Sequence, residues 1–313
     1  MSKIYAKING TGSYLPDKIL TNYDLEKLVD TTHEWIYERT GIVQRHIASD
    51  NESSVDMAYS SSIEALKKSN ISVDQIDMIV VATTTPERKF PSSAVLLQNK
   101  LKIEKGFAFD VNAACTGFVY AIDIADKYIK SGLVKNALVV GTEKITSLLD
   151  WKDRNTCVLF GDGAGAVVLS ASDQAGILSN TIGSNGSYKD LLTVNTDPEY
   201  IEMKGNDVFK IAVNTMGKLA VSTLKENNMN IDQVDWLIPH QANSRIINAI
   251  AKKISLPNDK VIMTVDKHGN TSAASIPLAL DDANKRGVLR NNDIIMFEAF
   301  GAGFTWGSTL LKF

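Results

Sequence analysis

The chain has 313 residues, of which 44% are hydrophobic and 22% are charged, and its formal net charge is −3. This composition is that of a globular protein with a large core, and the charge excludes a general attraction to nucleic acid or to an anionic membrane. Two cysteines form no disulfide framework, and no run of about 18 apolar residues occurs, so we expect a cytoplasmic protein that is neither secreted nor membrane-spanning.

Short apolar runs rich in β-branched residues alternate with amphipathic segments along the first half of the chain. Such runs predict buried strands at 78–83, 106–111, 137–143 and 166–170. Apolar residues at helical spacing predict helices at 92–101 and 116–132. Strands that alternate with helices predict an α/β fold.

The second half of the chain repeats this unit. Residues 230–243 (NIDQVDWLIPHQAN) echo residues 72–85 (SVDQIDMIVVATTT), and both halves close on a Phe-Gly turn that leads into a strand. A duplicated unit has a pseudo-twofold axis, near which equivalent loops meet. Strands are predicted at 236–240, 261–265 and 294–300, and a helix at 244–254.

A segment rich in Gly, Ser and Asn begins after residue 172 and is the predicted join between the halves. We therefore expect an N-terminal half of residues 1–172 and a C-terminal half of residues 173–313.

Cys115 stands where a predicted strand ends and a predicted helix begins. The unpaired N–H groups and partial positive charge of a helix N-terminus favour the thiolate, which is the nucleophilic form. Cys115 is therefore a candidate nucleophile that a thioester could acylate; the alternative is a buried structural cysteine. Cys157 lies in the strand-like segment CVLF and is interpreted as a small core residue.

His240 ends the strand at 236–240 and opens the following helix, near the predicted axis. Asn270 follows a strand and is interpreted as the repeat counterpart of Cys115, so the two side chains should face each other. The alternatives are a structural histidine at 240 and a helix N-cap at 270. The two cysteines and four histidines lack the close spacing of metal ligands, so no metal site is predicted.

The glycine cluster GDGAGAVV at 161–168 does not predict a dinucleotide site. A dinucleotide-binding turn reads GxGxxG and opens a helix, whereas here the spacing is GxGxG and a strand follows. A cysteine hydrolase is disfavoured because AACTG has glycine only after the cysteine. We expect no cofactor.

Seven motifs in order, spread over nearly the whole chain, resemble the β-ketoacyl-(acyl carrier protein) synthase III family of the thiolase-like superfamily. They are GTGSYLP, HEWIYERTGI, DVNAACTGF, FGDGAGAVVL, HQANSRII, GNTSAASIP and FGAGFTWG. The resemblance implies a duplicated five-layer α-β-α-β-α sandwich, a homodimer, and a catalytic triad of Cys115, His240 and Asn270. Chain-elongating relatives carry a second His in place of the Asn, degradative thiolases use a second Cys near the C-terminus, and plant-type polyketide synthases are longer.

The resemblance also implies a reaction. Cys115 takes the acyl group of an acyl-CoA, with acetyl-CoA as the expected primer, and the backbone N–H groups of Cys115 and Ala302 bind the oxyanion. Malonyl-acyl carrier protein then enters, and His240 and Asn270 donate hydrogen bonds to its thioester oxygen as CO₂ leaves. Acyl-CoA and malonyl-acyl carrier protein are thus substrates, and the product begins a fatty acid.

The CoA site is also implied by the resemblance. Trp35 and Arg154 would hold the adenine, and Arg39 would reach the phosphates. The residues expected along the pantetheine tunnel are Gly205, Phe209, Ala242 and Asn243. From the residues alone, a helix-packing aromatic and solvated surface arginines are the alternatives.

Acyl carrier protein is acidic, so its binding needs a local basic patch. Arg245 and Lys252 are seven residues apart on one helix, hence on one face, and Lys253 flanks them; a solvated helix face is the alternative. Phe90 matches the position that family members place in the acyl pocket of the partner subunit, and the alternative is a loop anchor beside Pro91.

Two other functions remain open from the sequence. One is a priming ketosynthase or acyltransferase of a secondary-metabolite pathway, which the three triad residues do not exclude. The other is a non-catalytic subunit that binds acyl carrier protein, against which the retained nucleophile argues.

Overall fold

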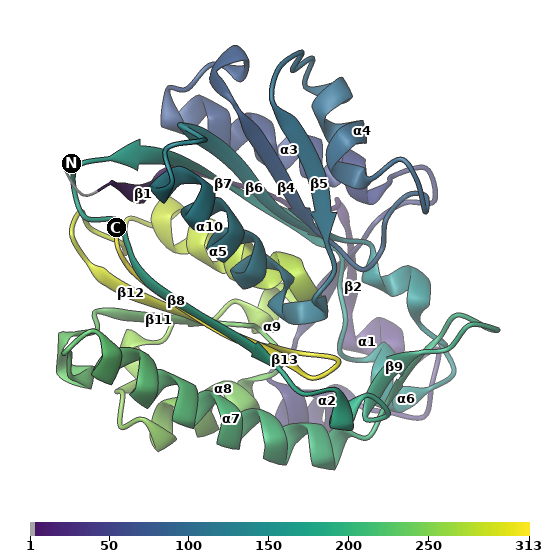
Figure 1. The fold of residues 1–313 in the computed structure, drawn as a ribbon. Helices are drawn as coiled ribbons and strands as arrows, with labels where there is room; N and C mark the ends of the chain where they lie inside the picture. The colour runs from purple at the N-terminus through teal and green to yellow at the C-terminus, as the bar shows by residue number, and fades with distance from the viewer. Residues whose placement is uncertain (1–3) are drawn as a thin grey trace.

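A computed structural model describes residues 4–313. Within this range, two main sheets lie between three layers of helices (Figure 1). The strands of the first sheet are ordered β1 (Tyr5–Tyr14), β7 (Gly163–Ser172), β6 (Asn136–Glu143), β4 (Met78–Ala82) and β5 (Phe107–Val111). Those of the second sheet are ordered β11 (Trp236–Pro239), β12 (Ile294–Gly301), β13 (Thr305–Lys312) and β8 (Ile177–Ser184). The α/β class and the five-layer α-β-α-β-α sandwich are confirmed.

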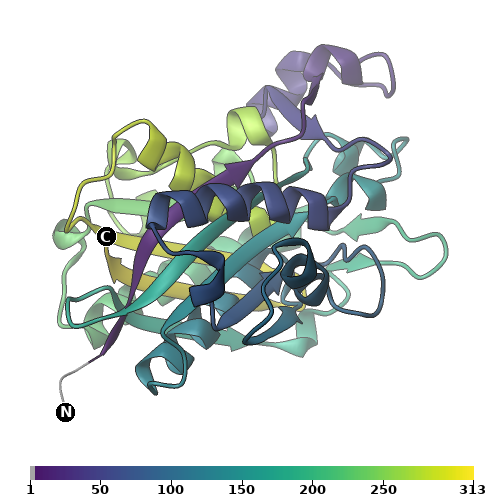
Figure 2. The ribbon, with the colours of Figure 1, turned by 90° about the horizontal axis from the view of Figure 1, so that it is seen from above.

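The long helices form the outer and central layers. On the outer face of the first sheet lie α3 (Ser54–Ser69) and α4 (Ser93–Lys100), with α3 running across β1, β7 and β6 (Figure 2). Between the sheets lie α5 (Gly117–Lys130) and α10 (Ser275–Lys285). Below the second sheet lie α7 (Gly205–Glu226) and α8 (Ser244–Lys253), which pack against each other.

Short elements complete the described chain. The short helices are α1 (Asn22–Leu25), α2 (His33–Thr40), α6 (Arg154–Cys157) and α9 (Val265–His268). Two-stranded ribbons pair β2 (Lys18–Thr21) with β3 (Gln44–Ile47) and β9 (Leu192–Val194) with β10 (Ile201–Met203). The 3-10 turns are η1 (Val73–Gln75), η2 (Ala114–Thr116), η3 (Ile145–Leu148), η4 (Gly186–Tyr188), η5 (Ile231–Gln233), η6 (Asn258–Lys260) and η7 (Ser272–Ala274).

The apolar runs become strands because helices cover both faces of each main sheet. Every residue of β4 is buried, and Val80 and Val81 project into the apolar clusters on opposite faces of the first sheet. A strand that is buried on both faces needs apolar residues throughout rather than alternation. Strand β6, whose residues 137–143 are all buried, follows the same rule.

Two local predictions are wrong. The run at 261–265 forms only an isolated bridge between Val261 and Leu237, and α9 begins at Val265. The side chain of Gln241 accepts hydrogen bonds from the N–H groups of Thr264 and Val265, so this segment bonds to a side chain instead of a strand. Cys157 is buried in the core as expected, but it ends helix α6 rather than lying in a strand.

The chain leaves the first sheet with β7 and enters the second with β8, and we propose that the two halves join here, near residue 172. The halves share the central layer. Helix α5 of the first half contacts β8 and β13, and α10 of the second half contacts β1 and β7.

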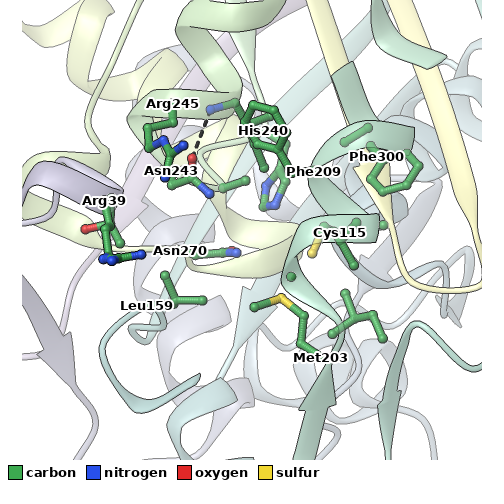
Figure 3. Close-up of a pocket in the computed structure, with 18 of the residues that line it drawn as sticks. Arg39, Cys115, Leu159, Met203, Phe209, His240, Asn243, Arg245, Asn270 and Phe300 are labelled. Carbon is green, nitrogen blue, oxygen red and sulfur yellow. Dashed lines mark hydrogen bonds between the residues drawn. The ribbon is translucent and has the colours of Figure 1, made fainter. Parts of the chain in front are cut away.

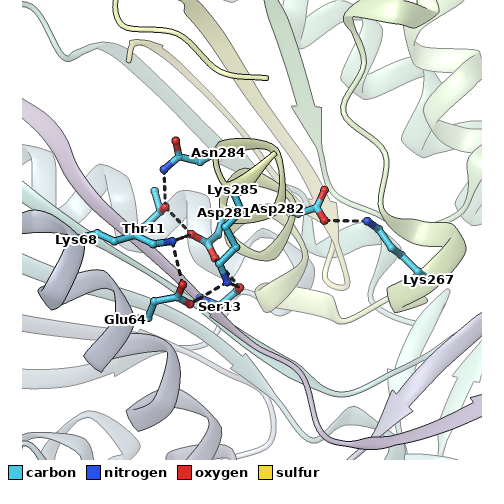
Figure 4. A network of polar contacts seen from close by, with 9 residues as sticks. All are labelled: Thr11, Ser13, Glu64, Lys68, Lys267, Asp281, Asp282, Asn284 and Lys285. Carbon is cyan, nitrogen blue, oxygen red and sulfur yellow. Dashed lines mark hydrogen bonds and ion pairs between the residues drawn. The ribbon is translucent and has the colours of Figure 1, made fainter. Parts of the chain in front are cut away.

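A buried carboxylate holds α10 against β1 and α3 (Figure 4). Asp281 accepts hydrogen bonds from the hydroxyls of Thr11 and Ser13, each at 2.6 Å, and from Lys68 Nζ at 2.7 Å; Lys285 Nζ lies 2.8 Å away. Burial raises the pKa of Asp281, but hydrogen bonds from Lys285 and Lys68 outweigh it, so the pKa is lowered overall. Folding therefore stabilises the ionised form of the Asp281 side chain.

Replacing Asp281 with asparagine should lower the free energy of unfolding by about 3 kcal/mol, because it breaks a buried ion-pair network from one side. Asp282→Asn is the matched control, since its partners Lys267 and Arg286 are half-exposed, and should cost less than about 1 kcal/mol. Urea unfolding measures both.

The contribution of Asp281 to the free energy of unfolding should depend on pH. Because the pKa of Asp281 is depressed in the folded state, this contribution is present above the unfolded pKa of about 4 and is lost as pH falls. A constant difference between wild type and variant down to acid pH would contradict this.

Candidate active site

A cavity of about 590 Å³ lies between the two halves, and Cys115, His240 and Asn270 all line it. The sulfur, the imidazole and the carboxamide point toward the same space (Figure 3). They come from η2, from the loop between β11 and α8, and from the loop between α9 and η7. Each of the three residues is less than 10% exposed. The residues that the motifs predicted as a triad are therefore brought together.

Cys115 lies in η2, directly before α5, which confirms its position between a strand and a helix. Burial raises the pKa of the Cys115 thiol to about 12; a hydrogen bond with Ser272 lowers it, and the charge of Glu143 raises it. Burial therefore outweighs the preference for thiolate that the helix N-terminus predicted, and the resting side chain is a thiol.

The backbone conformation shows that Asn270 is not the repeat counterpart of Cys115, contrary to the prediction from the sequence. Ala114 and Ser272 lie equally far beyond Asp77 and Asp235, and both have left-handed backbone conformations, with φ of 46° and 48°. The turns η2 and η7, which begin at these two residues, pack against each other. The true counterpart of Cys115 is thus the residue after Ser272, and Asn270 corresponds to residue 112. Cys115 and Asn270 meet in the cavity without being repeat equivalents.

His240 lies between β11 and α8 and does not open the helix, which begins at Ser244. Asn243 caps α8 by accepting a hydrogen bond from Ile246 N, so the residues between His240 and Asn243 form a turn. The backbone N–H of His240 donates to the backbone carbonyl of Glu298 at 2.7 Å. This bond ties the histidine to β12.

The His240 ring is neutral. Burial lowers its pKa to about 3, and Nδ1 lies 2.7 Å from Ser275 Oγ. Ser275 Oγ also accepts the N–H of Gln241, at 3.3 Å. We infer that the serine hydroxyl donates to Nδ1, which leaves the ring hydrogen on Nε2, the other ring nitrogen.

Asn270 is held on its backbone and on its side-chain oxygen. Its N–H donates to Leu159 O at 2.9 Å, and its carbonyl accepts the N–H of Gly161 at 3.1 Å. Asn270 Oδ1 accepts the N–H of Ser272 at 2.9 Å. Since the amide oxygen is used in this turn, the amide NH₂ is the group left for the cavity.

The strand β12 brings its end against the backbone of Cys115. A Cβ at Gly301 would lie 2.9 Å from Cys115 N and 3.1 Å from Ala113 O, both backbone atoms. The next residue, Ala302, is the expected second oxyanion donor, and its carbonyl accepts a hydrogen bond from Thr305 Oγ1. Glycine at 301 therefore allows the two chain segments to approach closely, and Gly301 lines the cavity whereas Ala302 does not.

Replacing Gly301 with alanine should slow acylation of Cys115 by about 100-fold, because the new Cβ displaces backbone next to the nucleophile. The rate of thioester transfer from acyl-CoA, followed by mass spectrometry, measures this. Gly186→Ala is the control, since a Cβ there meets nothing within 4 Å. Unchanged acylation in Gly301→Ala would contradict the close approach.

The residues predicted for CoA divide into two groups. The cavity is lined by Trp35, Arg39, Gly205, Phe209, Ala242 and Asn243. Arg154 is not a lining residue, but its guanidinium carbon lies 4.8 Å from the centre of the Trp35 ring. A planar base between Trp35 and Arg154 would need about 3.5–4 Å on each face, which is more than the present separation of the two side chains allows.

The predicted carrier-protein and acyl-pocket residues lie outside the cavity, except Arg245. Arg245 lines the cavity and places its guanidinium over the ring of Phe209. Lys252 is exposed on α8, and Lys253 donates to Asn214 Oδ1 on α7. Phe90 is 85% exposed, in the loop before α4, and does not line the cavity of its own chain.

Sequence reasoning missed four polar residues around the triad. Ser272 and Ser275 contact Cys115 and His240, respectively. Glu143 is fully buried and bonds Ser272, and Glu298 lines the cavity with neither carboxylate oxygen bonded to any residue of 4–313. Burial raises the pKa of Glu298 well above its ordinary value, which favours the neutral form of this side chain. The available signal was a single acidic residue in an otherwise apolar strand, as in IIMFEAF.

Among residues 4–313, no group of His, Cys, Asp and Glu is placed to hold a metal ion. No helix in that range is long and apolar enough to cross a membrane.

Comparisons with known proteins agree with this geometry. Residues 109–186 match the family model 3-oxoacyl-[acyl-carrier-protein (ACP)] synthase III, and residues 224–313 match the C-terminal model of the same family. A beta-ketoacyl-[acyl-carrier-protein] synthase III from Thioalkalivibrio sulfidiphilus (strain HL-EbGR7) is 55% identical over 99% of each chain.

Solved structures give the same result. The crystal structure of 3-oxoacyl-[acyl-carrier-protein] synthase III from Aquifex aeolicus VF5 has a TM-score of 0.97 and 49% identity, covering 98% of this chain and 100% of that chain. A priming β-ketosynthase of a polyketide biosynthetic pathway has a TM-score of 0.96 and 32% identity, covering 99% and 97%. The chain belongs to the 3-oxoacyl-[acyl-carrier-protein] synthase III family.

Proposed function

We propose that the protein condenses a short acyl-CoA, acetyl-CoA in the first instance, with malonyl-acyl carrier protein. The products are 3-ketoacyl-acyl carrier protein, CO₂ and CoA, and the reaction starts fatty acid synthesis. The observation that carries this proposal is one cavity that holds a thiol and two neutral N–H donors, on Cys115, His240 and Asn270.

The first half-reaction forms an acyl-enzyme. The Cys115 sulfur attacks the thioester carbon, and CoA leaves with its sulfur. The backbone N–H groups of Cys115 and Ala302 donate to the oxyanion of the tetrahedral intermediate. The covalent intermediate separates the two substrates in time, as in other nucleophilic transfers.

The second half-reaction removes CO₂ from the malonyl group. Decarboxylation leaves a pair of electrons on carbon and takes no proton, so it needs stabilisation of an enolate oxygen and no base. His240 Nε2–H and the Asn270 NH₂ group provide two donors for that oxygen. The resulting carbanion attacks the acyl group on Cys115.

We assign the CoA-binding residues from the cavity lining and from Arg154, which lies beside it against Trp35. The arginines stacked on Trp35 supply a planar surface and charge for adenine and phosphate, with Arg39 at 4.6 Å and Arg154 at 4.8 Å from the ring centre. The pantetheine arm would pass along Gly205, Phe209, Ala242 and Asn243 to reach Cys115.

Reversing the charge of Arg245 (Arg245→Glu) should lower kcat/KM for malonyl-acyl carrier protein by about tenfold, with a smaller effect on acylation by acyl-CoA. The reason is that Arg245, with Lys252 and Lys253, would meet the acidic carrier protein at the cavity mouth. Lys127→Glu on α5 is the control. Equal losses in both half-reactions would defeat this assignment.

We also propose a homodimer in the cytoplasm. Strand β5 is at the edge of the first sheet, and Phe107 on it is 40% exposed, so a second copy could pair there. Phe90, exposed in the loop between β4 and α4, would then enter the acyl pocket of the partner. Both cysteines are free and buried, which suits a reducing compartment.

A priming ketosynthase of a secondary-metabolite pathway is the second candidate, because a structure of that function matches over 99% of this chain. Both candidates use the same triad, so the primer and the acceptor distinguish them. A subunit that only binds carrier protein is disfavoured, since the thiol and both donors are in place.

The test is incubation with acetyl-CoA and malonyl-acyl carrier protein. We expect acetoacetyl-acyl carrier protein and one CO₂ per product. In a parallel reaction with carrier protein whose thiol is free, acetyl transfer to that thiol, combined with no CO₂ from malonyl-acyl carrier protein, would instead identify an acyltransferase. An inert Cys115 would identify a binding subunit.

A further inference from the structure

A buried carboxylate lies behind Cys115, and none of the steps above uses it. Glu143 ends strand β6 and is 0% exposed. Its Oε2 accepts hydrogen bonds from Thr85 Oγ1 at 2.7 Å and from Thr84 N at 3.0 Å. Its Oε1 accepts a hydrogen bond from Ser272 Oγ at 3.0 Å. The carboxylate is thus fixed in one orientation, with one oxygen toward the serine.

Ser272 connects this carboxylate to the nucleophile. Its hydroxyl donates to Glu143 and is also hydrogen-bonded with the Cys115 side chain. Its backbone N–H donates instead to Asn270 Oδ1. The positive φ of Ser272 belongs to turn η7, which packs against η2. The hydroxyl and the backbone of Ser272 therefore serve different members of the triad and can be altered separately.

Acylation requires an acceptor for the thiol proton. The pKa of Cys115 is raised to about 12, and that of His240 is lowered to about 3, so His240 is a very poor acceptor. Burial raises the pKa of Glu143, although hydrogen bonds from Thr85 and Thr84 lower it. Unlike Glu298, Glu143 has hydrogen-bond donors on both carboxylate oxygens, which favours its ionised form. An ionised Glu143 with a raised pKa is a stronger base than an ordinary carboxylate, and Ser272 connects it to Cys115.

We propose that Ser272 carries the proton of the Cys115 thiol to Glu143 during acylation. As the sulfur–carbon bond to the acyl group forms, the thiol proton passes to Ser272 Oγ, and the serine's own hydrogen passes to Glu143 Oε1. When the bond to the CoA sulfur breaks, the proton returns by the same route and leaves on CoA. No other reactant is required, and the carboxylate is restored.

The surroundings favour this route. Besides Cys115, the titratable groups that line the cavity are Arg39, Arg245, His240 and Glu298. The two arginines are cations with no acceptor, and burial favours the neutral form of His240 and Glu298. Lys144, next to Glu143, directs its Nζ to the carbonyl oxygens of Ser49 and Glu52. Glu143 is therefore the carboxylate that is connected to Cys115 by hydrogen bonds.

The proposal rests on the proposed function and is tested on each half-reaction separately. Acylation of Cys115 by acetyl-CoA is measured by rapid quench and mass spectrometry between about pH 6 and 9. Ser272→Ala and Glu143→Gln should each slow it by about 100-fold or more. In both variants the rate should rise about tenfold per pH unit, because hydroxide must then remove the proton. The wild-type profile should be nearly flat.

Release of CO₂ from malonyl-acyl carrier protein is the second readout. Ser272→Ala keeps the backbone N–H that holds Asn270, so CO₂ release should stay within about threefold of wild type. Thr85→Val is the control, since it removes a hydroxyl from Glu143 but keeps Ser272 in place, and its acylation profile should remain flat.

The outcomes are decisive. An equal loss of acylation and CO₂ release in Ser272→Ala, an unchanged acylation rate, or a pH profile like that of the wild type would each overturn the relay. Should Glu143→Gln fail to fold, Ser272→Ala alone decides. A wild-type protein that is not acylated at all would refute the proposed function instead.

Discussion

Replacing Cys115 with alanine should reduce condensation by at least about 10⁴-fold, because the acyl group then has no covalent carrier. Incubation of the variant with acetyl-CoA should give no mass increase, and no 3-ketoacyl product should form above background. CO₂ release from malonyl-acyl carrier protein should persist, since His240 and Asn270 remain in place. The two measurements together separate the nucleophile from the donors.

Cys157→Ala is the matched control for this substitution. Cys157 is buried in the core at the end of α6 and does not line the cavity. The control should lose some stability and retain both half-reactions. If the mass increase remained in Cys115→Ala and disappeared in Cys157→Ala, the nucleophile would be Cys157, which would contradict the account.

The second large effect is expected at the donors. Replacing His240 or Asn270 with alanine should lower CO₂ release by about 10²–10³-fold, because each removes one hydrogen-bond donor from the enolate oxygen. Acylation of Cys115 should continue in both variants. Asn112→Ala is the control, since it alters the repeat counterpart of Asn270, which lies outside the cavity lining.

The pH dependence of CO₂ release follows from the lowered pKa of the His240 imidazole. With a pKa of about 3, His240 is neutral above roughly pH 5, so CO₂ release should not decline as pH falls toward that value. A loss of CO₂ release with an apparent pKa near that of free histidine would show that the imidazole titrates and is not held neutral by burial.

Much of this site could be predicted from the sequence. Apolar runs such as 78–83 become strands because both sheet faces are covered, and the motifs around Cys115, His240 and Asn270 placed the triad in one cavity. The prediction of a strand at 261–265 was wrong because the N–H groups of Thr264 and Val265 donate to the side chain of Gln241. The spacing of apolar residues cannot reveal such a bond.

The electrostatics of Cys115 could not be predicted in the same way. The helix N-terminus is visible in the sequence, but the burial that overrides it depends on both halves of the chain. Likewise Glu143 and Ser272 are 129 residues apart, and their hydrogen bond exists only after the halves pack. The predicted pairing of Cys115 with Asn270 was wrong by three residues, because it aligned two residues with reactive side chains. The residues with left-handed backbone conformations, Ala114 and Ser272, mark the equivalent positions of the two halves.

The most direct measurement is a single turnover of enzyme whose Cys115 has first been loaded with a labelled acetyl group and freed of acetyl-CoA. Malonyl-acyl carrier protein is added, and the label is followed by rapid quench. We expect the label to leave Cys115 at the same rate at which it appears in acetoacetyl-acyl carrier protein, with one CO₂ released per label transferred. A label that stays on Cys115 after malonyl-acyl carrier protein is added, with product appearing only when fresh unlabelled acetyl-CoA is supplied, would contradict the account.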